Sequence, residues 1–304
     1  MFGNLSYILE GHIFNWFWLP REKRRERRFN ALHRVKFRQL RGMKSYVENL
    51  RPESSIAHKY NYDEEKYYTL WLQGEETAPA VVKGCIDSMR RYFGDKLIVI
   101  DEKNMDDYIH LPEYVMESWK NGTMTNTLFS DFCRMDLLTR YGGYWLDATG
   151  YVTDPLPEEI VKSDFFIFKS KKRHYDVMFM QTCFIRAKKG DPFMQMWKDV
   201  LFEYWKREGK SINYFLPHVL LRFMMLHNPY AKKLYEEMPY IPLENIHQLW
   251  YVYGNEQFTD GKFEEIKKLS FFHKCNYKQQ KKYNPVIEII PDSFADYIIN
   301  KSRK

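Results

Sequence analysis

The chain lacks the features that mark secreted and membrane-spanning proteins. Its 304 residues contain no apolar run that approaches the ~18 residues of a membrane-spanning helix. Its first residues carry neither the basic start nor the small-residue cleavage site of a signal peptide. The four cysteines are far apart and form no C-x-x-C pair, so the sequence indicates neither a zinc site nor a disulfide framework. We therefore expect a protein of a reducing cytosol.

The chain contains enough apolar residues to form a full hydrophobic core, and its positive charge is unevenly distributed along the sequence. Apolar residues make up 44% of the sequence and aromatic residues 17%, which supports one large domain or two small ones. The net charge is +7, but residues 21–51 hold twelve Lys or Arg against three Glu, whereas the rest of the chain has 35 basic and 37 acidic residues. The positive charge therefore belongs to one N-terminal segment.

This segment, residues 1–55, is predicted to be an aromatic and basic helical arm followed by a linker. Residues 8–19 are rich in Trp, Phe and Ile, and six Lys or Arg follow within residues 21–28. Tryptophans beside basic residues suit the headgroup region of an anionic membrane, where each Lys or Arg contributes ~1 kcal/mol. We expect residues 8–51 either to bind such a surface at the inner face of the cell membrane or to pack on the main domain. Nucleic acid is a less favoured partner, because no other part of the chain is basic enough to extend its footprint.

Residues 56–304 have the pattern of an α/β domain. We expect strands at residues 67–72, 96–101, 144–146, 164–169 and 182–187, and helices at residues 79–93, 191–209 and 212–227. The first strand, helix and strand form a βαβ unit, which implies parallel strands and a right-handed crossover. His218 lies in the last helix among Phe, Leu and Val, so we interpret it as a core histidine.

Residues 130–149, with the sequence SDFCRMDLLTRYGGYWLDAT, organise the rest of this domain. The first half is a helix with apolar residues around nearly its whole circumference, which predicts burial on most sides. Gly142 and Gly143 end it, because glycine permits the positive φ of a sharp reversal. A short strand then brings Asp147 to its carboxyl end, where open α/β sheets place their ligand crevices.

Two charges of this helix, Asp131 and Arg134, lie one turn apart on the same side. Buried charges are tolerated only when they are paired or face a polar cleft. Taken alone, the pair indicates a structural brace of a core helix. Followed by two glycines and an aspartate at a strand end, it indicates a binding site.

The whole constellation, S-D-x-x-R followed by G-G and a strand ending in D-x-T, resembles the sugar-nucleotide motif of retaining GT-A glycosyltransferases. It is most similar to the glycosyltransferase family 32 type and its bacterial capsular polysaccharide synthesis branch. The resemblance covers roughly residues 65–280 and leaves the arm outside. It implies a Rossmann-like, mostly parallel sheet flanked by helices.

The resemblance also implies roles for three charged residues. Asp147 would hold ribose and sugar hydroxyls and help to seat a divalent ion. Asp131 would accept hydrogen bonds from the hydroxyls of the donor sugar. Arg134 would orient that aspartate or reach the sugar and the phosphates. Relatives need no covalent nucleophile, because the departing phosphate takes the acceptor proton.

Four further residues are assigned to nucleotide binding through the resemblance. Trp71 would stack on the base, although a Trp in a strand is more often a core residue, and Gln73 would contact base or ribose. Trp145 lies in the strand that leads to the aspartate. Lys274 would approach the diphosphate from the C-terminal H-K segment.

The metal expectation rests on a departure from the motif of the relatives. Thr149 stands where they often carry a second aspartate, and a neutral hydroxyl cannot supply the anionic ligand that Mg²⁺ or Mn²⁺ prefers. Either Asp147 and His273 complete a weaker site for a divalent ion, or Lys274 and nearby cations replace the ion. Of the two, we expect the weaker site, with Mn²⁺ favoured over Mg²⁺ by the imidazole.

The sequence therefore predicts a transferase that moves a hexosyl unit from a nucleotide sugar, with UDP expected, to a surface or capsular polysaccharide or a glycolipid, with retention. Two other interpretations remain open. Paired acids also serve glycoside hydrolases, and a non-catalytic protein at the membrane surface would use the charge pair only as a brace.

Overall fold

The computed structural model describes residues 37–52, 65–171, 179–278 and 287–301, and within them one five-stranded and one two-stranded sheet. The large sheet has the order β2-β1-β3-β6-β5. Its strands are β1 (Tyr67–Leu70), β2 (Leu97–Ile100), β3 (Gly143–Leu146), β5 (Phe165–Lys169) and β6 (Met180–Ala187). The small sheet pairs β4 (Gly150–Val152) with β7 (Phe272–Lys274).

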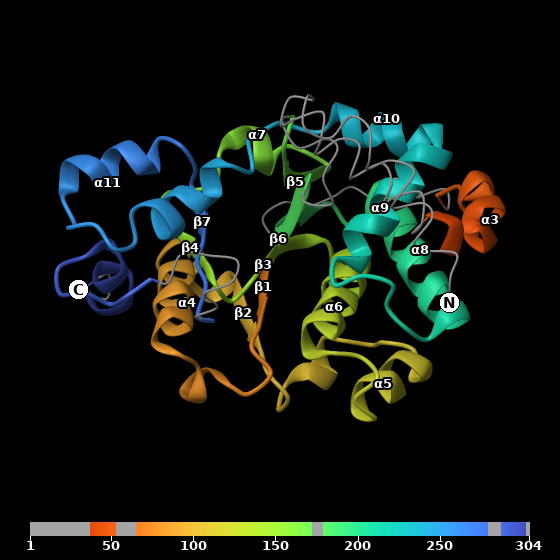
Figure 1. Cartoon of the computed structure of the whole chain (residues 1–304), viewed down its shortest axis with the longest axis horizontal. Helices are drawn as coiled ribbons and strands as arrows, with labels where there is room; N and C mark the ends of the chain where they lie inside the picture. Colours follow the sequence, from red (N-terminus) through yellow and green to blue (C-terminus); the bar gives the residue numbers. More distant parts are fainter. Residues whose placement is uncertain (1–36, 53–64, 172–178, 279–286, 302–304) are drawn as a thin grey trace, which may run out of the picture.

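Helices flank the large sheet on both sides, with α4 on one side and α6 on the other (Figure 1). The described helices are α3 (Lys44–Asn49), α4 (Ala80–Phe93), α5 (Glu113–Lys120), α6 (Asn126–Tyr141), α7 (Glu158–Val161), α8 (Pro192–Glu208), α9 (Leu216–His227), α10 (Pro229–Glu237), α11 (Asp260–Lys267) and α12 (Phe294–Asp296). In these described parts of the chain, no helix is both long and apolar enough to cross a bilayer.

The predicted α/β class is confirmed, and the sheet is mixed. Strand β1 runs parallel to both β2 and β3, as the βαβ pattern predicts. Strand β6 runs antiparallel to β3 on one side and to β5 on the other. Four strands therefore point one way and β6 the other. Only residues 170–179 separate β5 from β6, which is fewer than a crossover between parallel strands needs.

Side chains of β3 alternate between two separate cores. Trp145 packs with residues of α6, α8 and α9, whereas Tyr144 and Leu146 pack with residues of α4, β5 and β7. Because alternate residues of a strand share a face, Asp147 continues on the side of Trp145, toward α6.

The turn between α6 and β3 requires its glycines. Gly142 ends α6 with φ of 71°, and Gly143 follows with φ of 97°. A Cβ atom on Gly143 would lie 2.4 Å from the backbone oxygen of Lys66. Glycine therefore lets β3 start beside the segment that precedes β1, where the N–H of Tyr144 donates to the same oxygen at 2.9 Å.

The described part of the predicted arm packs on the main domain. Leu40, Met43 and Val47 are buried in the same core as α6 and α8. The amide of Asn228 donates to the backbone oxygens of Val47 and Leu50, at 2.9 Å each. Residues 8–36, which carry the aromatic run and most of the basic cluster, and the predicted boundary at residue 55 lie outside the described residues.

The small sheet was not predicted. The strands expected from the sequence did not include residues 150–152 or 272–274. In the structure β4 follows Asp147 almost at once and pairs with β7, so that Gly150 lies opposite Lys274. This pairing brings the C-terminal segment to the carboxyl end of β3.

Candidate active site

Asp147 lies at the carboxyl end of β3, as predicted, and four groups hold it there. Its N–H donates to the backbone oxygen of Cys183 at 2.8 Å. Its Oδ1 accepts the indole N–H of Trp145 at 3.0 Å and lies 3.2 Å from Nη2 of Arg134. Its Oδ2 accepts a hydrogen bond from the ammonium of Lys274 at 2.7 Å. Both carboxylate oxygens thus have charged or strongly polar partners.

Arg134 joins the two aspartates that the sequence singled out. Its Nη1 lies 3.4 Å from Asp131, and its Nη2 contacts Asp147. The same guanidinium donates to the Thr182 backbone oxygen at 2.8 Å and to the Ser130 hydroxyl at 3.0 Å. Since every nitrogen of this buried group is engaged and the ring of Trp145 lies 4.9 Å below it, Arg134 orients the carboxylates.

Lys274 completes a row of alternating charges. Besides its bond to Asp147, its ammonium donates to the hydroxyl of Thr149 at 2.6 Å. The pairing of β4 with β7 fixes this position, because the N–H of Cys275 also donates to the backbone oxygen of Thr149 at 2.8 Å. Asp131, Arg134, Asp147 and Lys274 therefore form one connected cluster, which we call the charge cluster.

The cluster shifts the ionisation of its carboxyl groups in opposite directions. Burial would raise the pKa of Asp147, but Lys274 and Arg134 outweigh it and lower the pKa to about 2. Burial raises the pKa of Asp131 to about 6, against the opposing effect of Arg134. Burial would lower the pKa of Lys274, but the charge of Asp147 outweighs it and the pKa is raised. At neutral pH the cluster carries two negative and two positive charges.

Trp71 lies beside the cluster at the end of β1, and Gln73 is exposed two residues further on. The half-buried indole of Trp71 packs with a small apolar cluster that includes Ala148, the neighbour of Asp147. The ring of Tyr277 meets it edge-on, with centroids 5.2 Å apart. Within the described chain, the indole N–H of Trp71 is buried and has no hydrogen-bond partner.

Trp145, which the resemblance assigned to nucleotide binding, is buried inside the domain. Only 1% of this residue is exposed, and its ring is enclosed between β3 and the core of α6 and α8. Its indole N–H donates to Asp147, and its face supports Arg134. Trp145 therefore positions the charge cluster and offers no face to a nucleotide.

His273 does not join Asp147 in a metal site. His273 and Lys274 are consecutive in β7, so their side chains leave the strand on opposite faces. His273 is fully buried and lies opposite Tyr151, which belongs to the core between α4 and the C-terminal helices. Because Lys274 is the side chain that reaches Asp147, the predicted pair of ligands does not form.

The remaining donors do not fit a divalent ion either. Thr149 is neutral and hydrogen-bonded to an ammonium, and the cation Lys274 already contacts Oδ2 of Asp147. Among the described residues, no group of three or more His, Cys, Asp or Glu side chains is arranged to hold a metal. The two carboxylates of the charge cluster are therefore already paired with cations.

His218 is the residue that sequence reasoning underestimated. It is buried, as predicted, but neither ring nitrogen forms a well-shaped hydrogen bond within the described residues. Burial, and then the charge of Arg134, lower its pKa to about 3, although the Met180 carbonyl and Asp147 oppose this. A neutral imidazole with unused donor and acceptor capacity thus lies within electrostatic reach of the cluster. Its apolar neighbours in the sequence gave no sign of this.

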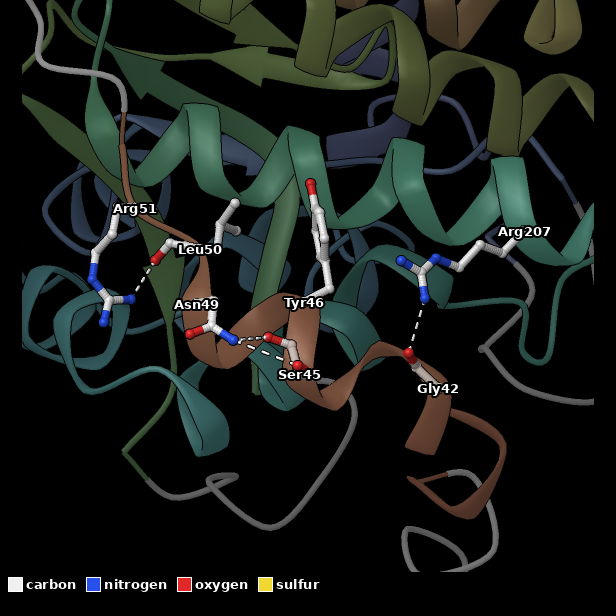
Figure 2. A pocket seen from close by; sticks show the side chains of 7 residues that line it. All are labelled: Gly42, Ser45, Tyr46, Asn49, Leu50, Arg51 and Arg207. Atoms are coloured by element: carbon white, nitrogen blue, oxygen red, sulfur yellow. Dashed lines mark hydrogen bonds between the residues drawn. The ribbon is translucent and has the colours of Figure 1, made fainter.

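A separate cavity of about 620 Å³ lies between α3 and α8 (Figure 2). Its lining shares no residue with the charge cluster and comprises Gly42, Ser45, Tyr46, Asn49, Leu50, Arg51 and Arg207. Arg207 donates to the backbone oxygen of Gly42 at 2.9 Å, and Arg51 to that of Leu50 at 2.7 Å. Arg207 therefore helps to join α8 to the segment that precedes α3, whereas Arg51 bonds the backbone of its own segment.

The chain is similar to several known proteins. O-glycosyltransferase braB from Annulohypoxylon truncatum is 24% identical over 231 residues, which are 68% of this chain and 52% of that protein. The chain thus spans about half the length of this curated relative. The PaToxG glycosyltransferase structure gives a TM-score of 0.37 at 14% identity, covering 80% of this chain and 94% of that one. The structure of glycosyltransferase GlyE from Streptococcus pneumoniae TIGR4 gives 0.40 at 8% identity, covering 77% and 60%.

The family match extends further than the resemblance in the motif. The family described as capsular polysaccharide synthesis protein matches residues 19–296, so it includes most of the basic arm that we had placed outside the similarity. The packing of Leu40, Met43 and Val47 into the main core gives this extension a physical basis. Because the match covers almost the whole sequence, the chain belongs to the capsular polysaccharide synthesis protein family, as residues 130–149 predicted.

Proposed function

We propose that this protein is a glycosyltransferase that moves a hexosyl unit from a nucleotide sugar, with UDP as the expected nucleotide. The acceptor is a growing surface or capsular polysaccharide or a glycolipid, and the resemblance implies retention. The observation that carries the proposal is the charge cluster at the carboxyl end of β3, where Lys274 and Asp147 are both partly exposed. The family and the O-glycosyltransferase relative support the same activity.

Each part of the site has a task in this reaction. Lys274 neutralises the diphosphate, and Asp131 and Asp147 accept hydrogen bonds from sugar hydroxyls. Trp71 contacts the base with its partly exposed ring. The bond between the anomeric carbon and the diphosphate oxygen breaks, and the anomeric carbon bonds to the acceptor hydroxyl oxygen. The hydroxyl proton leaves with the diphosphate, so no side chain has to act as a covalent nucleophile.

Fixed charges suit such a transfer because negative charge develops on the departing diphosphate. Charges that are already oriented cost no reorganisation when the transition state forms. Here Arg134, Trp145 and Thr149 hold Asp147 and Lys274 in place before a ligand arrives. The cluster is therefore preorganised for an anionic leaving group.

The contacts of Asp147 disfavour the hydrolase interpretation. A hydrolase needs one carboxyl group as an acid and the other as a base or nucleophile. Here each oxygen of Asp147 already contacts a cation, Oδ1 that of Arg134 and Oδ2 that of Lys274, which makes this carboxylate a poor base and a poor nucleophile. A scaffold would use the same cluster as a brace without binding a nucleotide.

Ligand binding tests the proposal directly. In a thermal-shift panel of UDP, GDP and CDP, at least one nucleotide should raise the melting temperature of the full-length protein. The same nucleotide should be released when its sugar conjugate is turned over. Glu65→Gln, at the other end of the large sheet, is the control and should retain the shift. Absence of any shift would favour the scaffold, and cleavage of a glycoside without nucleotide would favour the hydrolase.

We also propose that residues 8–51 bring the enzyme to an anionic membrane surface where its acceptor is assembled. The sequence supports this through twelve basic residues within 21–51. A truncated chain that starts at residue 37 keeps the buried residues of the described arm. Compared with the full chain, it should bind phosphatidylserine vesicles more weakly, and added salt should weaken binding of the full chain. Equal sedimentation of both proteins with vesicles would contradict this role.

A further inference from the structure

We infer that the ammonium of Lys274 occupies the position of the divalent cation, so that this protein binds its nucleoside diphosphate without a metal. The inference rests on the proposed function and specifies the electrostatics of the same site. It opposes the expectation from the motif, which was a weak metal site built from Asp147 and His273.

The first argument is the position of the ammonium between the two motif residues. In a D-x-D motif the ion would meet residues 147 and 149. Here the Lys274 Nζ atom lies 2.7 Å from Oδ2 of Asp147 and 2.6 Å from the hydroxyl of Thr149. One side chain from β7 thus bridges both motif positions, and a dication placed there would meet a positive charge at contact distance.

The second argument is that each oxygen of Asp147 already contacts a cation. Its other oxygen, Oδ1, lies 3.0 Å from the indole N–H of Trp145 and 3.2 Å from Arg134. A metal ion would have to displace one of these donors and lie near two cations. Asp131 cannot compensate, because the same Arg134 guanidinium contacts it at 3.4 Å.

The third argument is that the backbone holds Lys274 in place. Lys274 lies opposite Gly150 in the β4–β7 ladder. The backbone N–H of the next residue, Cys275, donates to the backbone oxygen of Thr149 at 2.8 Å. Gly150 permits this approach, since a Cβ atom there would lie 2.2 Å from the ring of Phe272. The ammonium is therefore positioned by secondary structure, as a metal is positioned by its ligands.

The fourth argument is unused hydrogen-bonding capacity. An ammonium has three donors, of which Asp147 and Thr149 take two. The side chain of Lys274 is 21% exposed, so the third donor can reach a ligand. The cluster is neutral as a whole, and a diphosphate oxygen supplies the missing acceptor. Charge-assisted bonds of this kind are about twice as strong as neutral ones.

Isothermal titration of the full-length protein with UDP, GDP and CDP, in excess EDTA and again in MnCl₂, tests the inference. Affinity for the preferred nucleotide should be the same within ~2-fold in the two buffers. Lys274→Met should weaken binding ~10- to 100-fold, which is the loss of one hydrogen bond to a charged group. Lys169→Met is the matched control, because Lys169 is a lysine whose ammonium is likewise held by the protein, bonded to the Tyr235 backbone oxygen at 2.8 Å. It should leave nucleotide affinity unchanged.

A gain-of-function variant keeps the test informative if Lys274→Met folds poorly. Thr149→Asp combined with Lys274→Ala removes the cation and restores the acidic pair. Nucleotide binding by this variant should depend on Mn²⁺, and Mn²⁺ alone should bind it more tightly than it binds the wild type. Wild-type binding that is lost in EDTA and restored by MnCl₂ would overturn this inference alone. Failure of all three nucleotides to bind in either buffer would overturn the proposed function, and this inference with it.

Discussion

Two buried clusters of opposite charges lie at the two ends of β3, and only one has the properties of a site. At the amino end, Arg186 of β6 pairs with Glu65 at 2.8 Å. Arg186 lies opposite Tyr144 in the ladder, with its guanidinium 5.6 Å from that ring. At the carboxyl end is the charge cluster of Asp131, Arg134, Asp147 and Lys274.

The two clusters differ in exposure. The side chains of Arg186 and Glu65 are 0% and 4% exposed, so neither can meet a ligand. In the charge cluster Arg134 is equally buried, at 5%, but Asp147 and Lys274 are 23% and 21% exposed. A buried arginine pair therefore does not identify a site by itself. A partly exposed carboxylate at the carboxyl end of parallel strands is the feature that favours a site.

Substitution of the acid in each cluster should separate the two roles most strongly. Asp147→Asn should reduce kcat/KM ~10²-fold or more, because a charge that orients Lys274 and the donor is lost. Glu65→Gln should leave the specific activity of the folded protein unchanged but destabilise it by ~3–5 kcal/mol, since Arg186 loses its buried partner. Steady-state kinetics and urea denaturation of both variants measure this difference. Near wild-type turnover by Asp147→Asn would remove the charge cluster from the reaction.

The two arginines offer the next comparison. Arg134→Lys keeps the charge but loses the planar fork that holds Ser130, Thr182 and both aspartates. We expect kcat/KM to fall ~10- to 100-fold together with the melting temperature. Arg186→Lys should lower only the melting temperature. If activity per folded molecule were unchanged in both variants, Arg134 would be a brace like Arg186.

The regions that sequence reasoning predicted well are those whose signals are local. The run from Ser130 to Asp147 specifies a buried helix, a glycine reversal and a strand end within twenty residues, and each is present. The β1-α4-β2 unit likewise follows from neighbouring periodic segments.

The small sheet depends on contacts that no local signal reveals. Strands β4 and β7 have three residues each and lie more than a hundred residues apart. Without their pairing, both His273 and Lys274 were expected at the site, His273 as a metal ligand beside Asp147 and Lys274 at the diphosphate. The alternation of a strand separates them, one toward Asp147 and one into the core. His218 was missed for the same reason, because the nearness of Arg134 and Asp147 is a tertiary fact.

The two buried histidines allow a finer comparison between the site and the core. Burial lowers the pKa of both His218 and His273 to about 3. In the unfolded chain these histidines take up a proton below their ordinary pKa of 6.5, whereas in the folded protein they stay neutral. Their contribution to the stability of the folded protein is therefore complete above pH 6.5 and is lost as the pH falls toward 3. Asp131 has the opposite effect on stability, because burial raises its pKa in the folded protein to about 6 from the ordinary 3.8. Between pH 6 and pH 3.8 the folded state therefore binds a proton that the unfolded state does not, which stabilises the folded state as the pH falls.

The expected outcome follows from these signs. His218→Leu and His273→Leu should each flatten the decrease of the melting temperature between pH 7 and pH 5. Only His218→Leu should also weaken nucleotide binding, by ~3- to 10-fold, because it removes one hydrogen-bonding group near the cluster. Identical nucleotide affinities in the two variants would return His218 to the core role that the sequence suggested.

The smallest effects should come from two adjacent residues of β3 that support different clusters. Trp145→Phe removes the indole N–H that bonds Asp147 and keeps an aromatic ring under Arg134. Tyr144→Phe removes a hydroxyl that interacts with Glu65 on the opposite face. The first change should weaken nucleotide binding a few-fold, since Asp147 keeps both of its cations and loses one hydrogen bond. The second should lower stability by ~1 kcal/mol and leave binding unchanged. Calorimetry of nucleotide binding and denaturant titration of the two variants would show whether the two faces of β3 affect binding and stability independently. A loss of binding in Tyr144→Phe as large as that in Trp145→Phe would show instead that the two clusters are coupled through β3.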